Sequence, residues 1–252
     1  MIKNNNFIKN LKISVITVTK NSEKFLEENL NSLANQTYKN FEHIIIDGQS
    51  TDRTIEIIKK NSDKISKWIS EPDKSLYDAM NKGIEVSSGD IIGILNSDDI
   101  YYPDALKIVN EYFSINGDLD FLFGSVQKYK LMHGYYPKKL KWTFGFYTSH
   151  SVGFFIKKSS QMSVGFYDTQ YKYSADYDLF YRMIIKNKMI GMATKKNEIL
   201  GKFRQGGLSS RIRYFDFLKE NNKIRINNGQ NIIIVYLIFI LRLLRNFKNI
   251  FK

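Results

Sequence analysis

The sequence predicts an α/β fold in which a mostly parallel sheet is flanked by helices. Short apolar runs rich in β-branched residues alternate with segments of helical periodicity over residues 12–95. Alternation of this kind favours parallel strand pairing with right-handed crossovers. Polar residues and acids follow the ends of several predicted strands, which is where open α/β sheets place their ligands. At 252 residues the chain is long enough for one large domain, or for one domain and a tail.

The first half of this pattern is two strand–helix units. Residues 12–18, KISVITV, predict a core strand, and the apolar residues of 25–34 recur with helical spacing. Residues 43–46, HIII, predict a second strand that ends at Asp47. The segment 47–52 then leads into a second helix. Asp47 could accept hydrogen bonds from a nucleobase or ribose, and the alternative is a tight turn with a helix cap.

The third unit leads to the most informative stretch of the chain. Residues 67–70 predict a short strand, and 75–86 predict a helix that carries Asp78 and Lys82. The apolar run 91–95 then predicts a buried strand, and it ends abruptly in Asn96, Ser97, Asp98 and Asp99. Two adjacent carboxylates repel each other, so a divalent cation that prefers oxygen, Mg²⁺ or Mn²⁺, is a natural partner. The alternative is a solvated Asp-rich turn before Pro103.

Two nucleotide-binding signatures are missing from the sequence. No G-x-G-x-x-G follows the first strand, and no G-x-x-x-x-G-K-[ST] occurs anywhere. Their absence disfavours a dehydrogenase or a P-loop protein. The chain contains no cysteine, which excludes disulfides and thiolate zinc sites.

The remainder of the chain predicts a helix at 105–113 and a strand at 121–126, and residues 152–156 form a further apolar run. Residues 127–150 are aromatic and basic, and they either stack against sugar rings or pack on the core as an irregular loop. Asp176 and Asp178 begin another helix, where the helix dipole favours acids. This position is compatible with a capping role or with a catalytic one.

The net charge of +13 belongs to the carboxyl-terminal end, because residues 181–252 hold 16 Lys and Arg against 3 Asp and Glu. Residues 232–241 form an apolar run too short to span a bilayer. Arg242 and Arg245 follow it, among leucines. This pattern predicts a basic amphipathic helix lying on an anionic membrane surface, with a core or dimer helix as the alternative. The charge lies beside aliphatic rather than base-reading polar residues, so we expect no nucleic-acid partner. Residues 1–10 show no signal peptide.

Four stretches in register carry a family resemblance: ISVITVTKN, IIIDGQSTDRT, ISEPDKSLYDAMNKG and SGDIIGILNSDD. Together, over about residues 12–104, they resemble the family 2 glycosyltransferases of the Rossmann-like GT-A fold. The resemblance is greatest to bacterial enzymes of O-antigen, capsule or exopolysaccharide synthesis. It implies transfer of a sugar from a nucleotide diphosphate sugar with inversion at the anomeric carbon.

The resemblance assigns roles to residues of the first half. It implies that Thr17, Thr19, Asp47, Asp78 and Lys82 line the nucleotide-sugar site, with Asp47 at a base that is commonly uracil. Asp98 matches the metal-binding acid of the family's D-x-D motif. The first position of that motif is Asn96, which brings no charge, so Asp99 is expected to share in binding Mg²⁺ or Mn²⁺.

In the second half, Asp176 matches the acid of the family's E-D-x-x-L motif, which is the general base in inverting members. The preceding Glu is replaced by Ala175, and Asp178 is the alternative base. Residues 203–210, FRQGGLSS, resemble the family's flexible loop over the diphosphate. Arg204, Gln205 and Ser209 are therefore candidate phosphate contacts, since an Arg fork matches phosphate geometry.

These observations predict a glycosyltransferase domain at 1–215, with a nucleotide-sugar half at about 12–104 and an acceptor half at 105–215. A helical tail at 216–252 follows, and it is expected to contact the membrane. The expected acceptor is a glycan hydroxyl, lipid-linked, used in surface polysaccharide synthesis at the cytoplasmic face of the cell membrane. The alternative function is that of a non-catalytic nucleotide-sugar-binding subunit of a membrane assembly.

Overall fold

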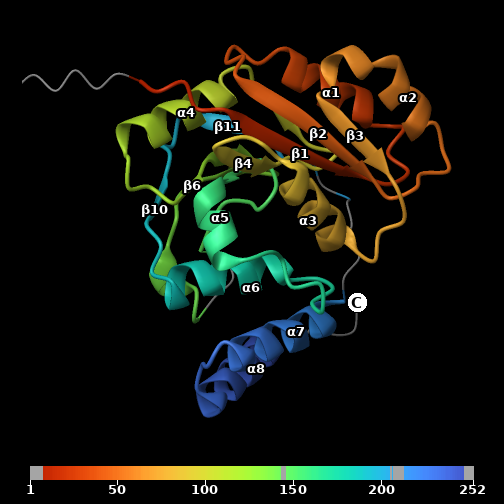
Figure 1. The fold of residues 1–252 in the computed structure, drawn as a ribbon. Coiled ribbons are helices and arrows are strands. Elements are labelled where there is room, and N and C mark those ends of the chain that lie inside the picture. Colours follow the sequence, from red (N-terminus) through yellow and green to blue (C-terminus); the bar gives the residue numbers. More distant parts are fainter. Residues whose placement is uncertain (1–7, 143–145, 205, 207–212, 247–252) are drawn as a thin grey trace, which may run out of the picture.

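The computed structural model describes residues 8–142, 146–204, 206 and 213–246. Within them, seven strands form one twisted sheet in the order β10-β6-β9-β4-β1-β2-β3 (Figure 1). Their bounds are β1 Ile13–Thr19, β2 Phe41–Asp47, β3 Lys67–Ser70, β4 Ile91–Ile94, β6 Phe121–Phe123, β9 Phe154–Lys157 and β10 Gly191–Ala193. The four strands expected in the first half are therefore confirmed.

The sheet is mostly parallel, as the alternating pattern predicts. Strand β1 pairs in parallel with β2 and β4, and β2 pairs in parallel with β3. Strand β9 runs antiparallel to both of its neighbours, β4 and β6. Every residue of β1 is buried, which is typical of a central strand covered on both faces.

Helices cover both faces of this sheet (Figure 1). Helices α1 (Leu26–Ala34), α2 (Thr54–Lys60) and α4 (Ala105–Ile115) lie on one face, and α3 (Leu76–Val86), α5 (Lys158–Val164) and α6 (Ala175–Tyr181) lie on the other. Residues of β2 alternate between the two: Ile45 packs with Leu26 and Leu30, whereas Ile44 and Ile46 join the core that includes α3 and α6. This is the period-two alternation of a strand.

A second, four-stranded sheet corrects one prediction. It has the order β5-β11-β7-β8 and consists of β5 Ile100–Tyr101, β11 Ile199–Lys202, β7 Ser125–Gln127 and β8 Leu131–Met132. The single strand predicted at 121–126 is wrong, because β6 and β7 lie in different sheets. Gly124 separates them, and a Cβ atom there would lie 2.0 Å from Cδ1 of Leu200. Only glycine lets the backbone approach β11 so closely while the chain changes sheets.

The carboxyl-terminal helices lie beyond α6 at one end of the molecule (Figure 1). Helix α6 continues into a π-helical turn, η3, at Arg182–Lys186; helices α7 (Tyr214–Asn227) and α8 (Ile232–Arg245) follow. Short 3₁₀ turns are η1 (Ser62–Lys64) and η2 (Pro137–Lys139). Glu220 of α7 accepts hydrogen bonds from the backbone N–H groups of residues 172, 173 and 174, which anchors α7 beside the start of α6. In the part of the chain that is described, no helix is long and apolar enough to cross a membrane.

Candidate active site

The first predicted site residues lie at the carboxyl ends of β1 and β2. Thr19 lies opposite Asp47 in the strand register. Thr17 is fully buried, and its Oγ1 lies 2.9 Å from Nε2 of His43. The hydroxyl of Thr17 is therefore engaged between the strands, whereas Oγ1 of Thr19 is buried without a hydrogen-bond partner among the described residues. Thr19 is the one of the two threonines with hydrogen-bonding capacity left for a ligand.

Asp47 is fully buried and organises the loops around it. Its carboxylate accepts hydrogen bonds from the Ser50 N–H at 3.0 Å and from Oγ of Ser70 at 2.7 Å. The Ser50 hydroxyl also donates to Oδ1 of Asp47, at 2.5 Å, and its Oγ accepts a hydrogen bond from the Asn21 N–H at 2.8 Å. Asp47 thus ties the loop after β1, the loop after β2 and the end of β3 into one rigid edge.

Asp78 and Lys82 lie one turn apart on α3, within a charged cluster. Nζ of Lys82 lies 2.8 Å from Glu71, 2.9 Å from Asp73 and 3.7 Å from Asp78. Burial lowers the pKa of Lys82, but the hydrogen bonds that its ammonium group donates to Glu71 and Asp73 outweigh this effect, and the pKa is raised overall. The ammonium group is thus surrounded by carboxylates, and a diphosphate would have to exchange with one of them to reach it.

The two acids after β4 lie in different environments. Asp99 is 1% exposed, and it accepts hydrogen bonds from Oγ of Ser151 at 2.6 Å and from the N–H of Arg204 at 2.8 Å. Burial, followed by the neighbouring Asp98 carboxylate, raises the pKa of Asp99 to about 7. Asp98 is only half-buried; burial raises its pKa, and the positive charge of Arg204 opposes this rise.

The residues around Asp98 fit a hard divalent cation. Oδ1 of Asn96 is buried and, within the described residues, has no hydrogen-bond partner. It and the Asp98 carboxylate are oxygen donors, the ligands that Mg²⁺ and Mn²⁺ prefer. The described residues contain no group of three or more His, Asp or Glu side chains arranged around a metal position. The protein would therefore supply few ligands, as expected where substrate phosphates complete the coordination of Mg²⁺.

Arg204 joins three distant segments. Its Nη2 lies 2.6 Å from Glu28, its guanidinium lies 4.2 Å from the ring centroid of Phe25, and its backbone N–H donates to Asp99. Its charge is therefore close enough to Asp98 to oppose the rise in the pKa of that carboxyl, and its role as a phosphate contact stays a prediction. Gln205 and Ser209, the other candidate phosphate contacts, lie outside the described residues.

Asp176 and Asp178 face different parts of the molecule. The Asp176 carboxylate accepts hydrogen bonds from the hydroxyls of Tyr147, at 2.8 Å, and Tyr77, at 3.2 Å. Asp178 is buried, lies 2.8 Å from Nε of Arg182 and accepts a hydrogen bond from the Asn228 side chain at 2.7 Å. Residues two apart on a helix do not share a face. Asp178 is thus engaged in holding α6 to the following segments, and Asp176 faces α3.

The segment 147–151 connects the two acidic sites, a connection that no sequence motif predicts. At one end Tyr147 donates to Asp176; at the other, Ser151 donates to Asp99 and accepts from the Asn96 N–H at 2.9 Å. His150 lies between them, with Nε2 at 2.7 Å from the Tyr167 hydroxyl. Val152, which follows, has φ of 71°, a genuine outlier for a β-branched residue. Strain of this kind persists only where the surrounding structure enforces it.

Lys128 is a further residue that the sequence analysis missed. It lies just past β7, with Nζ 4.3 Å from the ring centroid of Phe203. Burial lowers the pKa of Lys128, and the nearby carboxylates of Asp99 and Asp176 oppose this. It is a positive charge within reach of both acids. The one sequence signal for Lys128 is that it is a basic residue within the aromatic and basic stretch 127–150.

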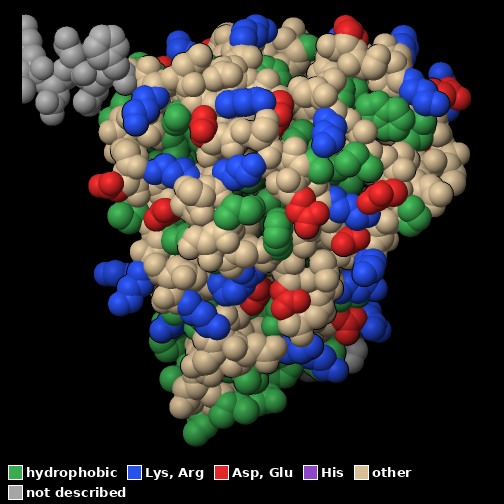
Figure 2. Space-filling model, in the orientation of Figure 1, with side chains coloured by type: hydrophobic (Ala, Val, Ile, Leu, Met, Phe, Trp, Pro, Cys, Tyr) green, Lys and Arg blue, Asp and Glu red, His purple; other side chains and the backbone are tan. Residues whose placement is uncertain are grey.

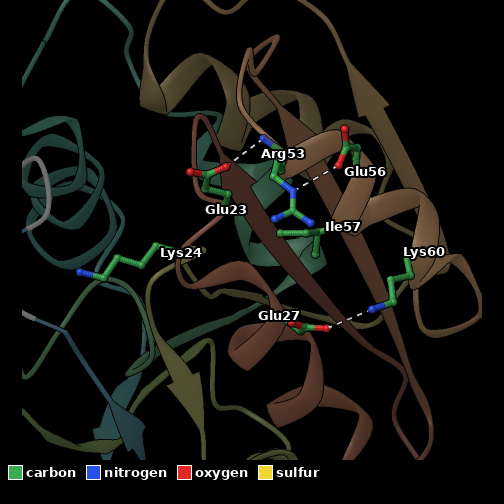
Figure 3. Close-up of a pocket in the computed structure, with 7 residues that line it drawn as sticks. All are labelled: Glu23, Lys24, Glu27, Arg53, Glu56, Ile57 and Lys60. Atoms are coloured by element: carbon green, nitrogen blue, oxygen red, sulfur yellow. Dashed lines mark hydrogen bonds and ion pairs between the residues drawn. The ribbon is translucent and has the colours of Figure 1, made fainter.

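A charged depression of about 570 Å³ between α1 and α2 contains none of the predicted site residues (Figure 3). Its lining carries balanced charges, Lys24, Arg53 and Lys60 against Glu23, Glu27 and Glu56, with Arg53 3.3 Å from Glu56 and Lys60 3.9 Å from Glu27. Because these groups neutralise one another, the depression offers no excess charge for a substrate. The acids at the carboxyl edge of the sheet form the better candidate.

Comparison with known proteins agrees with this geometry. Residues 14–180 match the family described as "Glycosyl transferase family 2". An uncharacterized glycosyltransferase of Methanocaldococcus jannaschii is 31% identical over 186 residues, which are 68% of this chain and 64% of the relative. A glycosyltransferase of PGL/p-HBAD biosynthesis from Mycobacterium tuberculosis is 26% identical over 223 residues, 82% of each chain. An uncharacterized glycosyltransferase of M. tuberculosis is 37% identical over 114 residues, and there the match spans only 44% of the relative's length.

Two solved structures share the fold. S. aureus TarS 1-349 in complex with UDP-GlcNAc has a TM-score of 0.67 at 17% identity, over 90% of this chain and 70% of that one. The mannosyltransferase PcManGT from Pyrobaculum calidifontis, in complex with GDP-Man and Mn²⁺, has a TM-score of 0.65 at 14% identity, over 91% and 68%. These likenesses show the GT-A fold. The family match over residues 14–180 establishes that this chain belongs to glycosyl transferase family 2.

Proposed function

We propose that the chain is an inverting glycosyltransferase that moves a sugar from a nucleotide diphosphate sugar to an acceptor hydroxyl. The observation that carries the proposal is the segment 147–151, which contacts Asp176 at one end and Asp99 and Asn96 at the other. A base and a diphosphate site held by one short segment can flank a single reacting carbon. The nucleotide-sugar half would then bind the donor, and the acceptor half would present the hydroxyl.

Asp176 is the proposed general base. Its carboxylate takes the proton of the acceptor hydroxyl, and the oxygen attacks the anomeric carbon from the face opposite the leaving nucleotide. The bond from that carbon to the diphosphate oxygen breaks, and the diphosphate leaves with the electron pair. One displacement inverts the configuration, and no covalent enzyme intermediate is needed.

Positive charge near Asp98 and Asp99 would stabilise the leaving diphosphate. The guanidinium of Arg204 is held there by Glu28 and Phe25, and the ammonium of Lys128 interacts electrostatically with Asp99 and with Asp176. A preorganised charge in a partly buried site stabilises developing negative charge better than water does. Asp98 and the Asn96 carbonyl would hold Mg²⁺ or Mn²⁺, which supplies further neutralisation of the diphosphate when bound.

The proposed donor is a UDP-sugar that carries a hexose or an N-acetylhexosamine. This choice is supported by the TarS structure, whose ligand is UDP-GlcNAc. The PcManGT structure holds GDP-Man and Mn²⁺, so GDP is the competing nucleotide to test. Metal dependence is supported by the same structure and by the oxygen donors around Asp98.

The proposed acceptor is a lipid-linked glycan, met at an anionic membrane surface. Helix α8 supports this: Ile232, Ile233, Tyr236, Leu237, Ile240, Leu241 and Leu244 are all exposed along it. They recur at the spacing of one helical face, whereas Val235 and Ile238 are buried on the other side. Figure 2 shows the exposed hydrophobic side chains gathered at the end of the molecule where α8 lies.

A second segment extends this apolar face. Arg242 of α8 donates a hydrogen bond to the carbonyl of Trp142, and Gln230 donates to that of Lys141. Trp142 is 56% exposed, and Lys138, Lys139 and Lys141 beside it are exposed as well. An aromatic residue and lysines bordering an apolar face are the pattern of an interfacial surface that binds anionic lipid. We propose peripheral attachment to the cytoplasmic face of the cell membrane, in surface polysaccharide synthesis.

Two measurements test the proposal. Donor binding is assayed by thermal shift with UDP, GDP, CDP and dTDP, each with and without Mn²⁺; one nucleotide is expected to raise the melting temperature in a metal-dependent way. Transfer is then assayed with Asp176→Asn, which should abolish turnover and keep the nucleotide shift. Asp118→Asn, at an exposed position, is the control and should transfer as the wild type does.

The outcomes separate the enzyme from a binding subunit. If a nucleotide raises the melting temperature of the wild type but the wild type neither transfers sugar nor hydrolyses the donor, the non-catalytic alternative is favoured. This alternative is worth testing because the two motifs contain the neutral residues Asn96 and Ala175. Full transfer by Asp176→Asn would remove Asp176 as the base. Absence of any nucleotide shift would contradict the donor site itself.

A further inference from the structure

We propose that Tyr147 and Tyr77 are positioning residues for Asp176, whose carboxylate their hydroxyls hold in one orientation from two different elements of the fold. This inference rests on the proposed function of Asp176 as the base. The family motif assigns the acid; nothing in the motif assigns the two tyrosines. They come from segments 70 residues apart in the chain, and only the fold brings them to the same carboxylate.

The hydrogen bonds define the geometry. Tyr147 donates to Oδ2 of Asp176 at 2.8 Å, and Tyr77 donates to Oδ1 at 3.2 Å. One donor on each oxygen fixes both the direction and the plane of the carboxylate. An ionised carboxylate has about four lone-pair sites. Each oxygen therefore keeps capacity to accept the proton of an acceptor hydroxyl while the tyrosines stay in place.

Tyr147 is held rigidly enough to position another group. Its ring centroid lies 4.6 Å from that of Phe146, 4.8 Å from that of Phe180 and 5.4 Å from that of Phe123. Packed aromatic rings of this kind have little rotational freedom. The hydroxyl of Tyr147 is therefore delivered to Asp176 by the core rather than by a mobile side chain.

Tyr77 connects the base to the donor side. It is 5% exposed and belongs to α3, the helix that also carries Asp78 and Lys82. Its hydroxyl lies 3.1 Å from the carbonyl oxygen of Tyr173 as well as 3.2 Å from Asp176. A hydroxyl has one proton to donate, so Tyr77 divides it between two acceptors. We therefore expect Tyr147 to contribute more than Tyr77.

Both tyrosines remain hydrogen-bond donors around neutral pH. Burial, and then the Asp176 carboxylate, raise the pKa of Tyr147 and the pKa of Tyr77 well above 10. Neither phenol competes with Asp176 for the role of base, since neither loses its proton. They serve to hold the carboxylate, and misplacement of a catalytic group by even a fraction of an ångström lowers the rate.

The test is a set of variants that each remove a single hydroxyl. Tyr147→Phe is expected to lower kcat about 10-fold, with the KM of donor and acceptor and the melting temperature close to the wild-type values. A carboxylate that loses a donor to its ionised form takes up a proton more readily, so the acid limb of the activity profile should move to higher pH. Tyr77→Phe should show the same changes to a smaller extent.

Tyr135→Phe is the matched control. Its ring lies in the same aromatic cluster, 5.5 Å from that of Phe121 and 5.4 Å from that of Phe123, and its hydroxyl makes no hydrogen bond to Asp176 in the described part of the chain. It should leave kcat and the pH profile unchanged. An unchanged kcat and pH profile in Tyr147→Phe, or an equal loss in Tyr135→Phe, would overturn the proposal.

A readout without turnover keeps this inference distinct from the proposed function. The carbon-13 signal of the Asp176 carboxyl group, identified by its disappearance in Asp176→Asn, should shift in Tyr147→Phe and stay in place in Tyr135→Phe. If the signal moves but the wild type transfers no sugar, the hydrogen bonds stand and the assignment of Asp176 as a base fails. If the signal does not move, the positioning role is wrong whatever the activity.

Discussion

Individual residues owe their roles to where their side chains point, and Asp176 and Asp178 illustrate this. They belong to the same short helix, yet Asp178 is buried with Arg182 while Asp176 meets two tyrosines from other elements. Breaking a buried ion pair costs about 3–5 kcal/mol because the remaining charge has no partner. Asp178 is therefore a structural acid, and its replacement would confound any test of the base.

A second residue, His43, predicts how stability depends on pH. It is 1% exposed on β2, and burial lowers its pKa to about 3. In the unfolded chain its pKa returns to about 6.5, so below that pH the unfolded state binds a proton that the folded state does not. The contribution of neutral His43 to the free energy of unfolding is therefore fully present above about pH 6.5. It is lost as the pH falls toward 3, at about 1.4 kcal/mol per pH unit.

We therefore expect the free energy of unfolding to fall by about 2 kcal/mol more in the wild type than in His43→Gln between pH 6.5 and pH 5. Gln keeps a donor for Oγ1 of Thr17 but does not titrate. Urea unfolding of both proteins at the two pH values measures the difference. Equal losses in the two proteins would show that His43 is not neutral in the folded state.

At the scale of the element, α3 is the part of the fold on which the site depends most. It carries Asp78, Lys82 and Tyr77, and it lies directly on the sheet because Gly83 leaves room for β1. A Cβ atom at Gly83 would lie 2.3 Å from Cγ2 of Ile16, which is fully buried. The β-branched Ile16 has few rotamers with which to escape. Close packing of α3 therefore requires glycine at this position.

Gly83→Ala is expected to destabilise the protein. Alanine favours the helix by about 1 kcal/mol, but overpacking of a buried contact costs about 1–3 kcal/mol, and a 2.3 Å approach puts this contact at the upper end of that range. A net loss of about 1–2 kcal/mol should lower the melting temperature by several degrees. Gly117→Ala, where nothing lies within 4 Å of the added atom, is the control for thermal unfolding and should melt as the wild type does. A melting temperature of Gly83→Ala at or above the wild-type value would contradict the close packing.

Elements of the first half were predictable because each is specified locally. The strands β1, β2 and β4 are rich in buried apolar residues, and Ser75 caps the start of α3 by accepting a hydrogen bond from the Asp78 N–H. The break between β6 and β7 was not predictable in the same way. The residues 121–126 have strand composition throughout, and the need for Gly124 arises from Leu200 in a distant strand.

Considering the whole molecule, α8 and the segment 138–142 form an apolar and basic surface that the transfer reaction alone does not require. Helix α8 contains no acidic residue, and the exposed lysines 138, 139 and 141 border its apolar face. Helix α7 connects this end to the start of α6 through Glu220. A membrane bound at this surface would therefore lie on the same side of the molecule as α6, the helix that carries Asp176.

Flotation with vesicles tests this surface. The protein should bind vesicles that contain one part phosphatidylglycerol to two parts phosphatidylcholine, and bind pure phosphatidylcholine much less. Leu237→Asn with Ile240→Asn should weaken binding to both. Replacing Lys138, Lys139 and Lys141 by Glu should weaken binding to the anionic vesicles more than 10-fold, since each lysine near such a surface contributes about 1 kcal/mol.

Ile190→Asn is the control, because Ile190 is 56% exposed at a different place in the fold. It should bind vesicles as the wild type does. A different result would assign this face to a second copy of the chain. In that case the wild type would form a stable dimer in solution and would not bind vesicles, and the variant with Leu237→Asn and Ile240→Asn would be a monomer.

The α/β class and the parallel core could be predicted from the sequence alone, and its motifs single out Asp98 and Asp176 as candidate site acids. These follow from local periodicity and from short motifs, in which the relevant residues are neighbours in the chain. The side chains that surround these acids depend on tertiary packing. Tyr77 and Tyr147 reach Asp176 from elsewhere in the chain, and Ser151 and the backbone of Arg204 reach Asp99, the neighbour of Asp98. Contacts between distant segments depend on how the elements pack, and a pattern of neighbours along one chain contains no signal for them.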